Sequence, residues 1–176
     1  MPVGLDSDDF SLFGLEKRFA IDRAALDTQW RRLQSEVHPD RFAGEGASAQ
    51  RMAMQWAVRV NEAYNRLKDP LRRAAYLCEL QGAAVAAETN TAMPTAFLMQ
   101  QMDWREALDD AATVADVEQI DTTVQAAQAA LLADAARLLD SEGNVAAAAA
   151  KVRALMFVAR FRQDIERRLD VLDTSR

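Results

Sequence analysis

The chain has 176 residues, half of them hydrophobic, and a net charge of -6. No uninterrupted apolar run approaches the roughly 20 residues needed to span a bilayer, so we expect a soluble protein that does not act in a membrane. The single cysteine excludes an intrachain disulfide. With only one histidine as well, a metal or cofactor site built from this chain alone is not expected. After residue 80, 15 acidic residues outnumber 9 basic ones, which argues against nucleic acid as the ligand of that half.

Two amphipathic helices dominate the first 80 residues. Hydrophobic residues recur three and four positions apart up to Val37, and again from Ala53 to Leu67, which predicts a helix over 23–37 and a second that ends near Lys68. Asp22 and Ser48 are the expected N-caps, and a loop with two glycines separates the helices. We therefore expect an antiparallel helical hairpin.

Shorter helices are expected on either side of this hairpin. Residues 9–14 are predicted to form a first helix that places two phenylalanines in the core. Pro70 suits the first turn of a helix over 71–80, and Gly82 can end that helix with a left-handed residue. Residues 1–10 are acidic and lack the positive region of a secretory signal, so the cytoplasm is the expected location.

A second helical domain is expected after a linker. Helical periodicity fades over residues 81–93, which gives a domain over 1–80 and another over 94–176. Three apolar stripes then predict a helix over 95–112, a helix capped by Asp116, and a last helix from Val145, with a turn before it. Short connections between three helices imply an antiparallel bundle. The predicted fold class is all-α, with a three-helix bundle at the carboxyl end.

A short polar break interrupts the two long helices of the first domain. It contains His38, the only histidine of the chain. Pro39 disfavours helical dihedrals at His38 and lacks a backbone donor, so the first helix should end near Val37. His38 and Asp40 are then left at an exposed corner. Arginines beside the corner suggest a basic strip, although a merely solvated helix face is an open alternative; they are Arg31, Arg32 and Arg41.

The helix over 95–112 carries more hydrophobic residues than one packed face needs. Phe97 and Trp104 belong to the predicted core stripe, and a second apolar group lies offset from them, with acidic neighbours. Flexible methionines suit an adaptable binding surface. The alternative is that this group packs against the first domain or completes a wide core. The group comprises Leu98, Met99 and Met102, with Asp103 and Glu106 beside it and Phe157 of the last helix as a possible extension.

The His38-Pro39-Asp40 tripeptide between two amphipathic helices resembles the signature of the J-domain, the activating module of DnaJ-type co-chaperones. Residues 61–70, followed by Arg72, Arg73 and Tyr76, resemble the closing pattern of that domain. Residues 10–15 fit its start, and residues 95–106 look like the start of the carboxyl-terminal domain of the HscB family. The chain is therefore identified as similar to the HscB family, which comprises J-type co-chaperones of iron–sulfur cluster assembly.

This resemblance implies a two-ended adaptor that is not an enzyme. One end would engage an HscA-type chaperone of the seventy-kilodalton class and stimulate its ATP hydrolysis; the implied contacts are His38, Pro39, Asp40, Arg31, Arg32 and Arg41. The other end would bind an IscU-type iron–sulfur scaffold; the implied contacts are Leu98, Met99, Met102, Asp103, Glu106 and Phe157. A general J-domain co-chaperone serving a DnaK-type chaperone and a different client is the alternative. An enzyme using His38 as a base and Asp40 as its orienting acid is disfavoured, because no nucleophile motif accompanies them.

Overall fold

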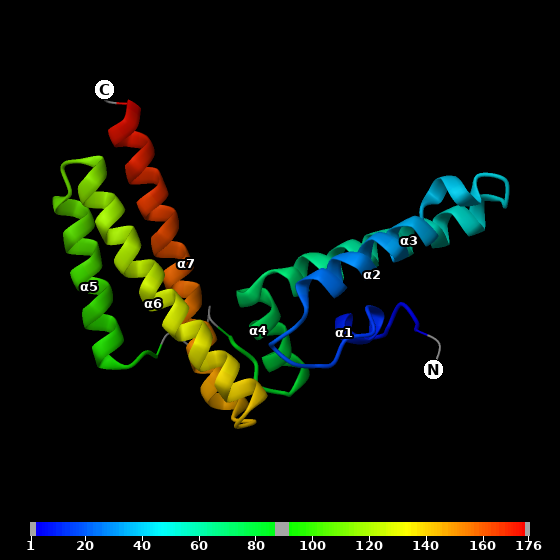
Figure 1. Cartoon of the computed structure of the whole chain (residues 1–176), viewed down its shortest axis with the longest axis horizontal. Helices are drawn as coiled ribbons and strands as arrows, with labels where there is room; N and C mark the ends of the chain where they lie inside the picture. The colour runs from blue at the N-terminus through cyan, green and yellow to red at the C-terminus, as the bar shows by residue number, and fades with distance from the viewer. Residues whose placement is uncertain (1–2, 87–91, 175–176) are drawn as a thin grey trace. The chain divides into compact units, whose positions relative to one another are not determined.

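The computed structural model describes residues 3–86 and 92–174. All regular secondary structure in these ranges is helical, which confirms the predicted all-α class (Figure 1). The chain divides into two compact units, the first ending at Leu77 and the second beginning at Cys78. Residues 87–91, inside the expected linker, lie outside the described residues. Among the described helices, none is long and apolar enough to cross a membrane.

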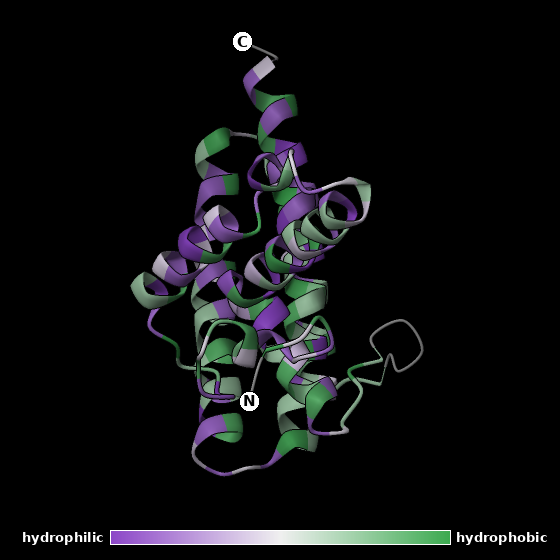
Figure 2. Cartoon of the chain, turned by 90° about the vertical axis from the view of Figure 1, so that its right-hand side faces the viewer, coloured by the Kyte–Doolittle hydropathy of each residue, from purple (hydrophilic) through white to green (hydrophobic). Residues whose placement is uncertain are grey.

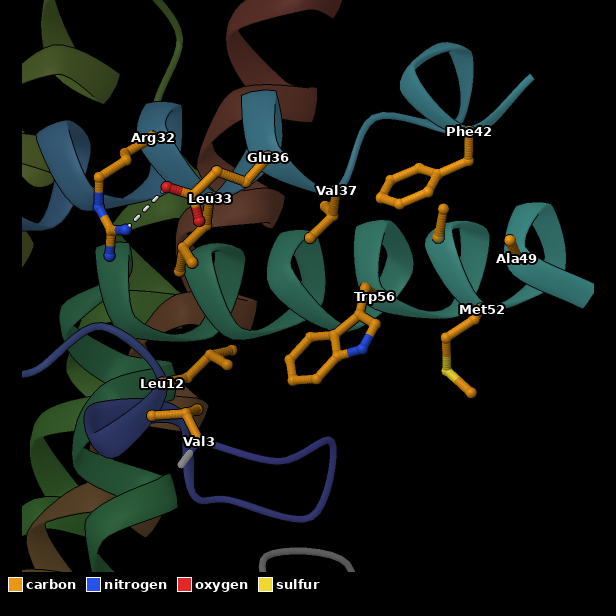
Figure 3. Close-up of a pocket in the computed structure, with 11 residues that line it drawn as sticks. Val3, Leu12, Arg32, Leu33, Glu36, Val37, Phe42, Ala49, Met52 and Trp56 are labelled. Atoms are coloured by element: carbon orange, nitrogen blue, oxygen red, sulfur yellow. Dashed lines mark hydrogen bonds and ion pairs between the residues drawn. The ribbon is translucent and has the colours of Figure 1, made fainter. Parts of the chain in front are cut away.

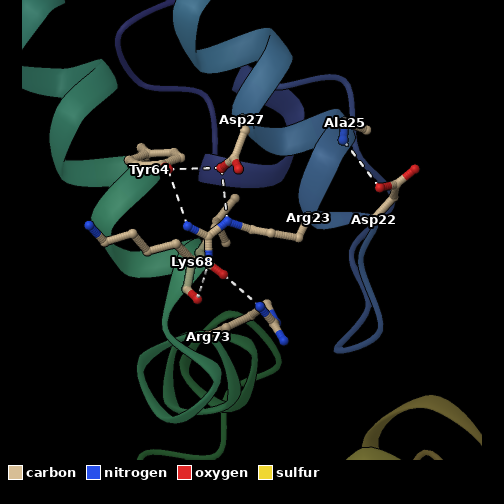
Figure 4. Close-up of polar contacts among 8 residues, drawn as sticks. Asp22, Arg23, Ala25, Asp27, Tyr64, Lys68 and Arg73 are labelled. Carbon is tan, nitrogen blue, oxygen red and sulfur yellow. Dashed lines mark hydrogen bonds and ion pairs between the residues drawn. The ribbon is translucent and has the colours of Figure 1, made fainter.

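Helices α2 (Arg23–Glu36) and α3 (Ala47–Lys68) form the predicted antiparallel hairpin of the first unit (Figure 1). Asp22 caps α2 as expected, since its carboxylate accepts a hydrogen bond from the Ala25 backbone N–H at 3.2 Å (Figure 4). The prediction that Ser48 caps α3 is wrong. Gly46 occupies the N-cap position with a φ of +94°, a conformation that glycine adopts without a steric penalty.

The base of the hairpin is closed by an aromatic and polar cluster (Figure 4). The rings of Trp30 and Tyr64 stack with centroids 4.4 Å apart. The Tyr64 hydroxyl donates to Asp27 at 2.8 Å, and Arg23 Nε donates to the same carboxylate at 2.8 Å. The hydrogen bond from Arg23, followed by that from Tyr64, lowers the pKa of Asp27. The cluster therefore links the first turns of α2 to the last turns of α3.

The shorter helices flank the hairpin much as expected. Helix α1 (Asp9–Leu12) ends before the predicted limit of residue 14, because Gly14 adopts a left-handed φ of +65°. Pro70 begins α4 (Pro70–Leu80), where a missing backbone donor costs no helical hydrogen bond. Gly82 follows α4 with a φ of +82°, which confirms its expected role at the end of that helix.

A buried carboxylate fastens α1 to α3. Asp9 is fully buried, and its two oxygens lie 2.8 Å from Arg59 Nη1 and 3.0 Å from Arg66 Nη1. Its backbone N–H donates to the Tyr76 hydroxyl of α4 at 3.0 Å. The adjacent Phe10 ring, also fully buried, stacks on Tyr76 with centroids 6.0 Å apart. The amino-terminal helix is thus held to two other helices by charge, hydrogen bonding and ring contact together.

The second unit contains α5 (Thr95–Asp110), α6 (Val114–Asp140) and α7 (Val145–Thr174), with α6 antiparallel to the other two (Figure 1). Hydrophobic and hydrophilic residues are mixed along these helices, as expected of amphipathic segments (Figure 2). The prediction that Asp116 caps α6 is wrong. Thr113 is the N-cap, and Asp116 is its reciprocal partner in a capping box. The core of the bundle is formed by Trp104, Leu108, Ala111, Val117, Val124, Val158, Phe161 and Ile165.

Cys78 is buried in the second unit. Burial, more than the nearby charge of Glu79, raises the pKa of its thiol to about 11. The thiol is therefore protonated at neutral pH and lacks the thiolate that nucleophilic or redox chemistry needs. Cys78 acts as a small hydrophobic core residue.

Replacing Asp9 with asparagine tests the role of the buried carboxylate. The free energy of unfolding should fall by about 3 kcal/mol, the low end for breaking a buried ion pair, because both arginines keep some access to water. Urea denaturation followed by circular dichroism measures the change. The exposed Asp6→Asn variant removes the same charge three residues earlier and should unfold like the wild type. Equal stability of the two variants would contradict the role assigned to Asp9.

Candidate functional site

The polar break forms a defined corner at one end of the hairpin. Residues Pro39–Phe42 form a 3₁₀ helix, η1, and His38 stands at its N-cap. His38 Nδ1 accepts a hydrogen bond from the Asp40 backbone N–H at 3.3 Å, which assigns the proton of the neutral ring to Nε2. The side chains keep 56% exposure for His38 and 93% for Asp40. The predicted exposed corner is present, and it is more regular than the sequence indicated.

The three arginines near the corner have different surroundings. Arg41 Nη1 donates to the Ser35 carbonyl in the last turn of α2 at 3.3 Å. Arg32 Nη1 lies 2.9 Å from a Glu36 carboxylate oxygen, so its charge is paired along the same helix. Arg31 is exposed one turn before Ser35 on α2. Arg41 thus contacts the last turn of α2, Arg31 is exposed, and a neighbouring acid partly neutralises Arg32.

The geometry of the corner does not favour an enzyme. His38 Nδ1 is engaged by backbone and lies 3.6 Å from the Asp40 carboxylate, and both side chains open onto solvent. A catalytic base usually needs a water-excluding site and an adjacent reacting group. Within residues 3–86 and 92–174, no group of three or more histidine, cysteine or acidic residues is placed to hold a metal ion. Both side chains are accessible from solvent.

An apolar groove of about 550 Å³ lies beside the corner, between α2 and α3, and extends to Leu12 of α1 and to Val3 (Figure 3). Sequence periodicity missed it, because Met52 and Trp56 lie off the stripe predicted for α3. Met52 is 50% exposed, so the outer part of the groove is open to solvent. Besides these two residues, the groove is lined by Val3, Leu12, Arg32, Leu33, Glu36, Val37, Phe42, Ala49 and Ala53.

The surplus apolar residues of α5 are exposed. Leu98, Met99 and Met102 keep 45%, 60% and 69% of their accessible surface, while Trp104 on the other side of the helix is buried. This difference excludes the alternative in which the group completes the core of the bundle. Asp103 and Glu106 are exposed on the same helix, as expected for an acidic margin.

Phe157 is half-buried on α7, where the Arg160 guanidinium lies 6.0 Å from its ring centroid. Helices α5 and α7 run in the same direction, and the Trp104 ring stacks on Phe161 at 5.8 Å. Phe157 precedes Phe161 by one helical turn. It therefore lies level with the turn of α5 that precedes Trp104, close to the height of the methionines.

A second groove, of about 590 Å³, lies between α5 and α6. Trp104 and Ile120 line it together with three acidic residues, Asp103, Asp110 and Asp116. The sequence does not predict this groove, because the groove forms only where residues of two helices meet. Asp103 thus borders both the exposed apolar group and an acidic hollow.

Comparison with known proteins places both units in one family. Residues 93–166 match the family model described as the HSCB C-terminal oligomerisation domain. The chain is 47% identical to the co-chaperone protein HscB homolog of Burkholderia multivorans, over 98% of this chain and 99% of that one. Chaperone HscB from Vibrio cholerae has 38% identity and a TM-score of 0.80, over 94% of this chain and 99% of that one. Human co-chaperone protein HscB has 26% identity and a TM-score of 0.87, over 92% and 81%. The chain belongs to the HscB family, the J-domain co-chaperones of iron–sulfur cluster assembly.

Proposed function

We propose that this co-chaperone is a two-ended adaptor in the cytoplasm. Its first domain, residues 1–80, stimulates the ATPase of an HscA-type chaperone, and its second, residues 94–176, delivers an IscU-type scaffold across the linker at 81–93. The observation that carries the proposal is that one chain exposes a polar, partly basic corner and a methionine-rich face with an acidic margin. Surfaces of such different chemistry fit two different partners.

The corner is the proposed chaperone contact. Its exposed groups supply both signs of charge, and the contact residues are His38, Pro39, Asp40, Arg31, Arg32 and Arg41. The ATP site belongs to the partner. By binding the hydrolysis-competent state of the chaperone better than its resting state, the corner shifts the population toward hydrolysis.

The α5 face is the proposed scaffold contact. Its exposed methionine side chains adapt to a partner surface, and its acids favour a partner with basic groups at the matching rim. The contact residues are Leu98, Met99, Met102, Asp103, Glu106 and Phe157. Because both partners bind one molecule, the scaffold gains a high effective concentration at the chaperone's peptide-binding site. Self-association of the bundle is the competing use of this face, suggested by the description of the matching family model.

The His38→Gln variant tests the chaperone end. Steady-state ATP turnover of an HscA-type chaperone is measured with the co-chaperone and the scaffold, added separately and together. Stimulation by the variant should fall by about tenfold or more, as expected for a central contact, while scaffold affinity stays unchanged. Absence of stimulation by the wild type, with a demonstrably active chaperone, would reject that partner. Stimulation without scaffold binding would favour the general J-domain co-chaperone of a DnaK-type chaperone.

The Met102→Ala variant tests the scaffold end. Truncating this exposed side chain should weaken scaffold binding about tenfold in calorimetry, a loss of about 1.4 kcal/mol, as expected of the minority of interface residues that cost more than about 1 kcal/mol. Chaperone stimulation without scaffold should not change. The control is Gln100→Ala, which alters an exposed residue of α5 that faces away from the apolar group. Sedimentation of the free protein tests self-association: a wild-type dimer that Met102→Ala dissociates would assign the face to a second copy.

The Glu36→Gln variant tests whether the ion pair with Arg32 competes with the chaperone. Freeing Arg32 should lower the half-saturating concentration for ATPase stimulation about twofold at low salt, the scale of an exposed helical ion pair. The gain should shrink as salt screens the charges. Glu45→Gln removes an equal charge from the loop after the corner and should give a smaller effect. Equal effects of the two variants would show that only net charge matters.

A further inference from the structure

Contacts within the corner are too few to fix its orientation on the hairpin. The helix η1 has four residues, none of them buried. Its own support is a short run of backbone hydrogen bonds: the Arg41 N–H donates to the His38 carbonyl at 3.0 Å, the Ala43 N–H to the Asp40 carbonyl at 3.4 Å and the Glu45 N–H to the Phe42 carbonyl at 3.0 Å. One 3₁₀ turn is too short to be stable alone, because it fixes several dihedral angles for only a few hydrogen bonds. Side chains that reach the hairpin must therefore hold it.

Three side-chain contacts join this segment to the hairpin. Arg41 donates to the Ser35 carbonyl of α2 at 3.3 Å. Gln50 Nε2 of α3 donates to the Ala43 carbonyl at 3.2 Å. Between these two polar contacts, Phe42 at the end of η1 turns its ring toward α3 and lines the apolar groove (Figure 3).

The phenylalanine is the strongest of the three contacts. Both hydrogen bonds lie at exposed positions, where water competes for the same donors and acceptors, so their net contribution is small. Phe42 is half-buried and lies against the hydrophobic residues of two helices. An aromatic ring removed from water contributes more than an exposed neutral hydrogen bond. Phe42 is also the only large apolar side chain of η1 apart from the proline ring.

We propose that Phe42 is the positioning residue of the chaperone-binding corner, an inference that rests on the proposed function of that corner. Its ring anchors η1 in the groove between α2 and α3, and thereby fixes the direction in which His38 and Asp40 project. Without the ring, the corner samples several orientations, and a chaperone binds only the competent fraction. The apparent affinity then falls in proportion to that fraction, whereas the fully bound complex is unchanged.

The proposal is tested by measuring separately the half-saturating concentration and the maximal stimulation of the chaperone ATPase. In the chaperone ATPase assay, Phe42→Ala should raise the half-saturating concentration about tenfold, as for a competent fraction near one tenth, and keep the maximal stimulation. Phe42→Leu, which retains an apolar anchor, should restore most of the affinity. Met52→Ala is the matched control, since it removes an exposed apolar side chain of the same groove that points away from the Phe42 ring (Figure 3). If Met52→Ala weakens stimulation as much as Phe42→Ala, the groove itself contacts the chaperone and the proposal is wrong. Loss of maximal stimulation, as for His38→Gln, also overturns it.

Amide hydrogen exchange supplies a readout that needs no chaperone. In Phe42→Ala, the Arg41 and Ala43 amides should exchange faster, while the amides of α2 and α3 keep their protection. Unchanged exchange in η1 refutes the anchor even if the wild type stimulates no chaperone, so failure of the proposed function and failure of this inference are distinguishable. If circular dichroism shows that Phe42→Ala loses hairpin helix, the comparison is made on Phe42→Leu and Phe42→Val. Amide exchange in η1 that is faster in Phe42→Leu than in the wild type, and faster again in Phe42→Val, supports the anchor. Identical exchange in both variants and the wild type rejects it.

Discussion

The hairpin of the first unit depends on the backbone constraint that Pro39 imposes at the end of α2. A proline has no N–H to continue a helix, and it pushes the preceding residue toward extended dihedrals. His38 accordingly has a φ of −61° and a ψ of 127°, and α2 ends at Glu36. The chain can then turn through η1 and return as α3, which makes the hairpin possible and puts the only histidine at its tip. The sharp end of α2 also leaves carbonyl groups of its last turn without helical partners, and Arg41 satisfies one of them.

Most of the fold follows from local patterns that act within a few residues. Periodicity identified the long helices, and Asp22, Pro70 and Gly82 play their expected parts, because each acts on the backbone beside it. Ser48 and Asp116 were assigned wrongly for a related reason. Both lie within three residues of the true helix start, where several polar residues compete and the backbone angle of Gly46 or the reciprocal bonds of Thr113 decide.

The sequence predicted the motifs of the candidate site, but not the contacts that surround them. The exposure of Met102 follows from its angular offset on α5, which a sequence displays directly. The groove at Trp56, the pairing of Arg32 with Glu36 and the ion pairs of Asp9 depend on contacts between chosen rotamers or between helices far apart in sequence. A charge on a helix face looks the same in sequence whether it meets solvent or a partner one turn away.

The length of α3 sets the distance between the two ends of the hairpin. Its 22 residues rise about 33 Å at 1.5 Å per residue, from the end that carries the corner to the end that leads into α4. The chain therefore leaves the hairpin at the end opposite the corner, and a rigid helix sets the separation. Inserting one residue would lengthen this spacing only slightly, yet it would turn the start of α4 by about 100° around the helix axis relative to the corner. The number of residues in α3 is therefore constrained, whatever those residues are. It fixes the rotation of the corner relative to the start of α4 around the helix axis.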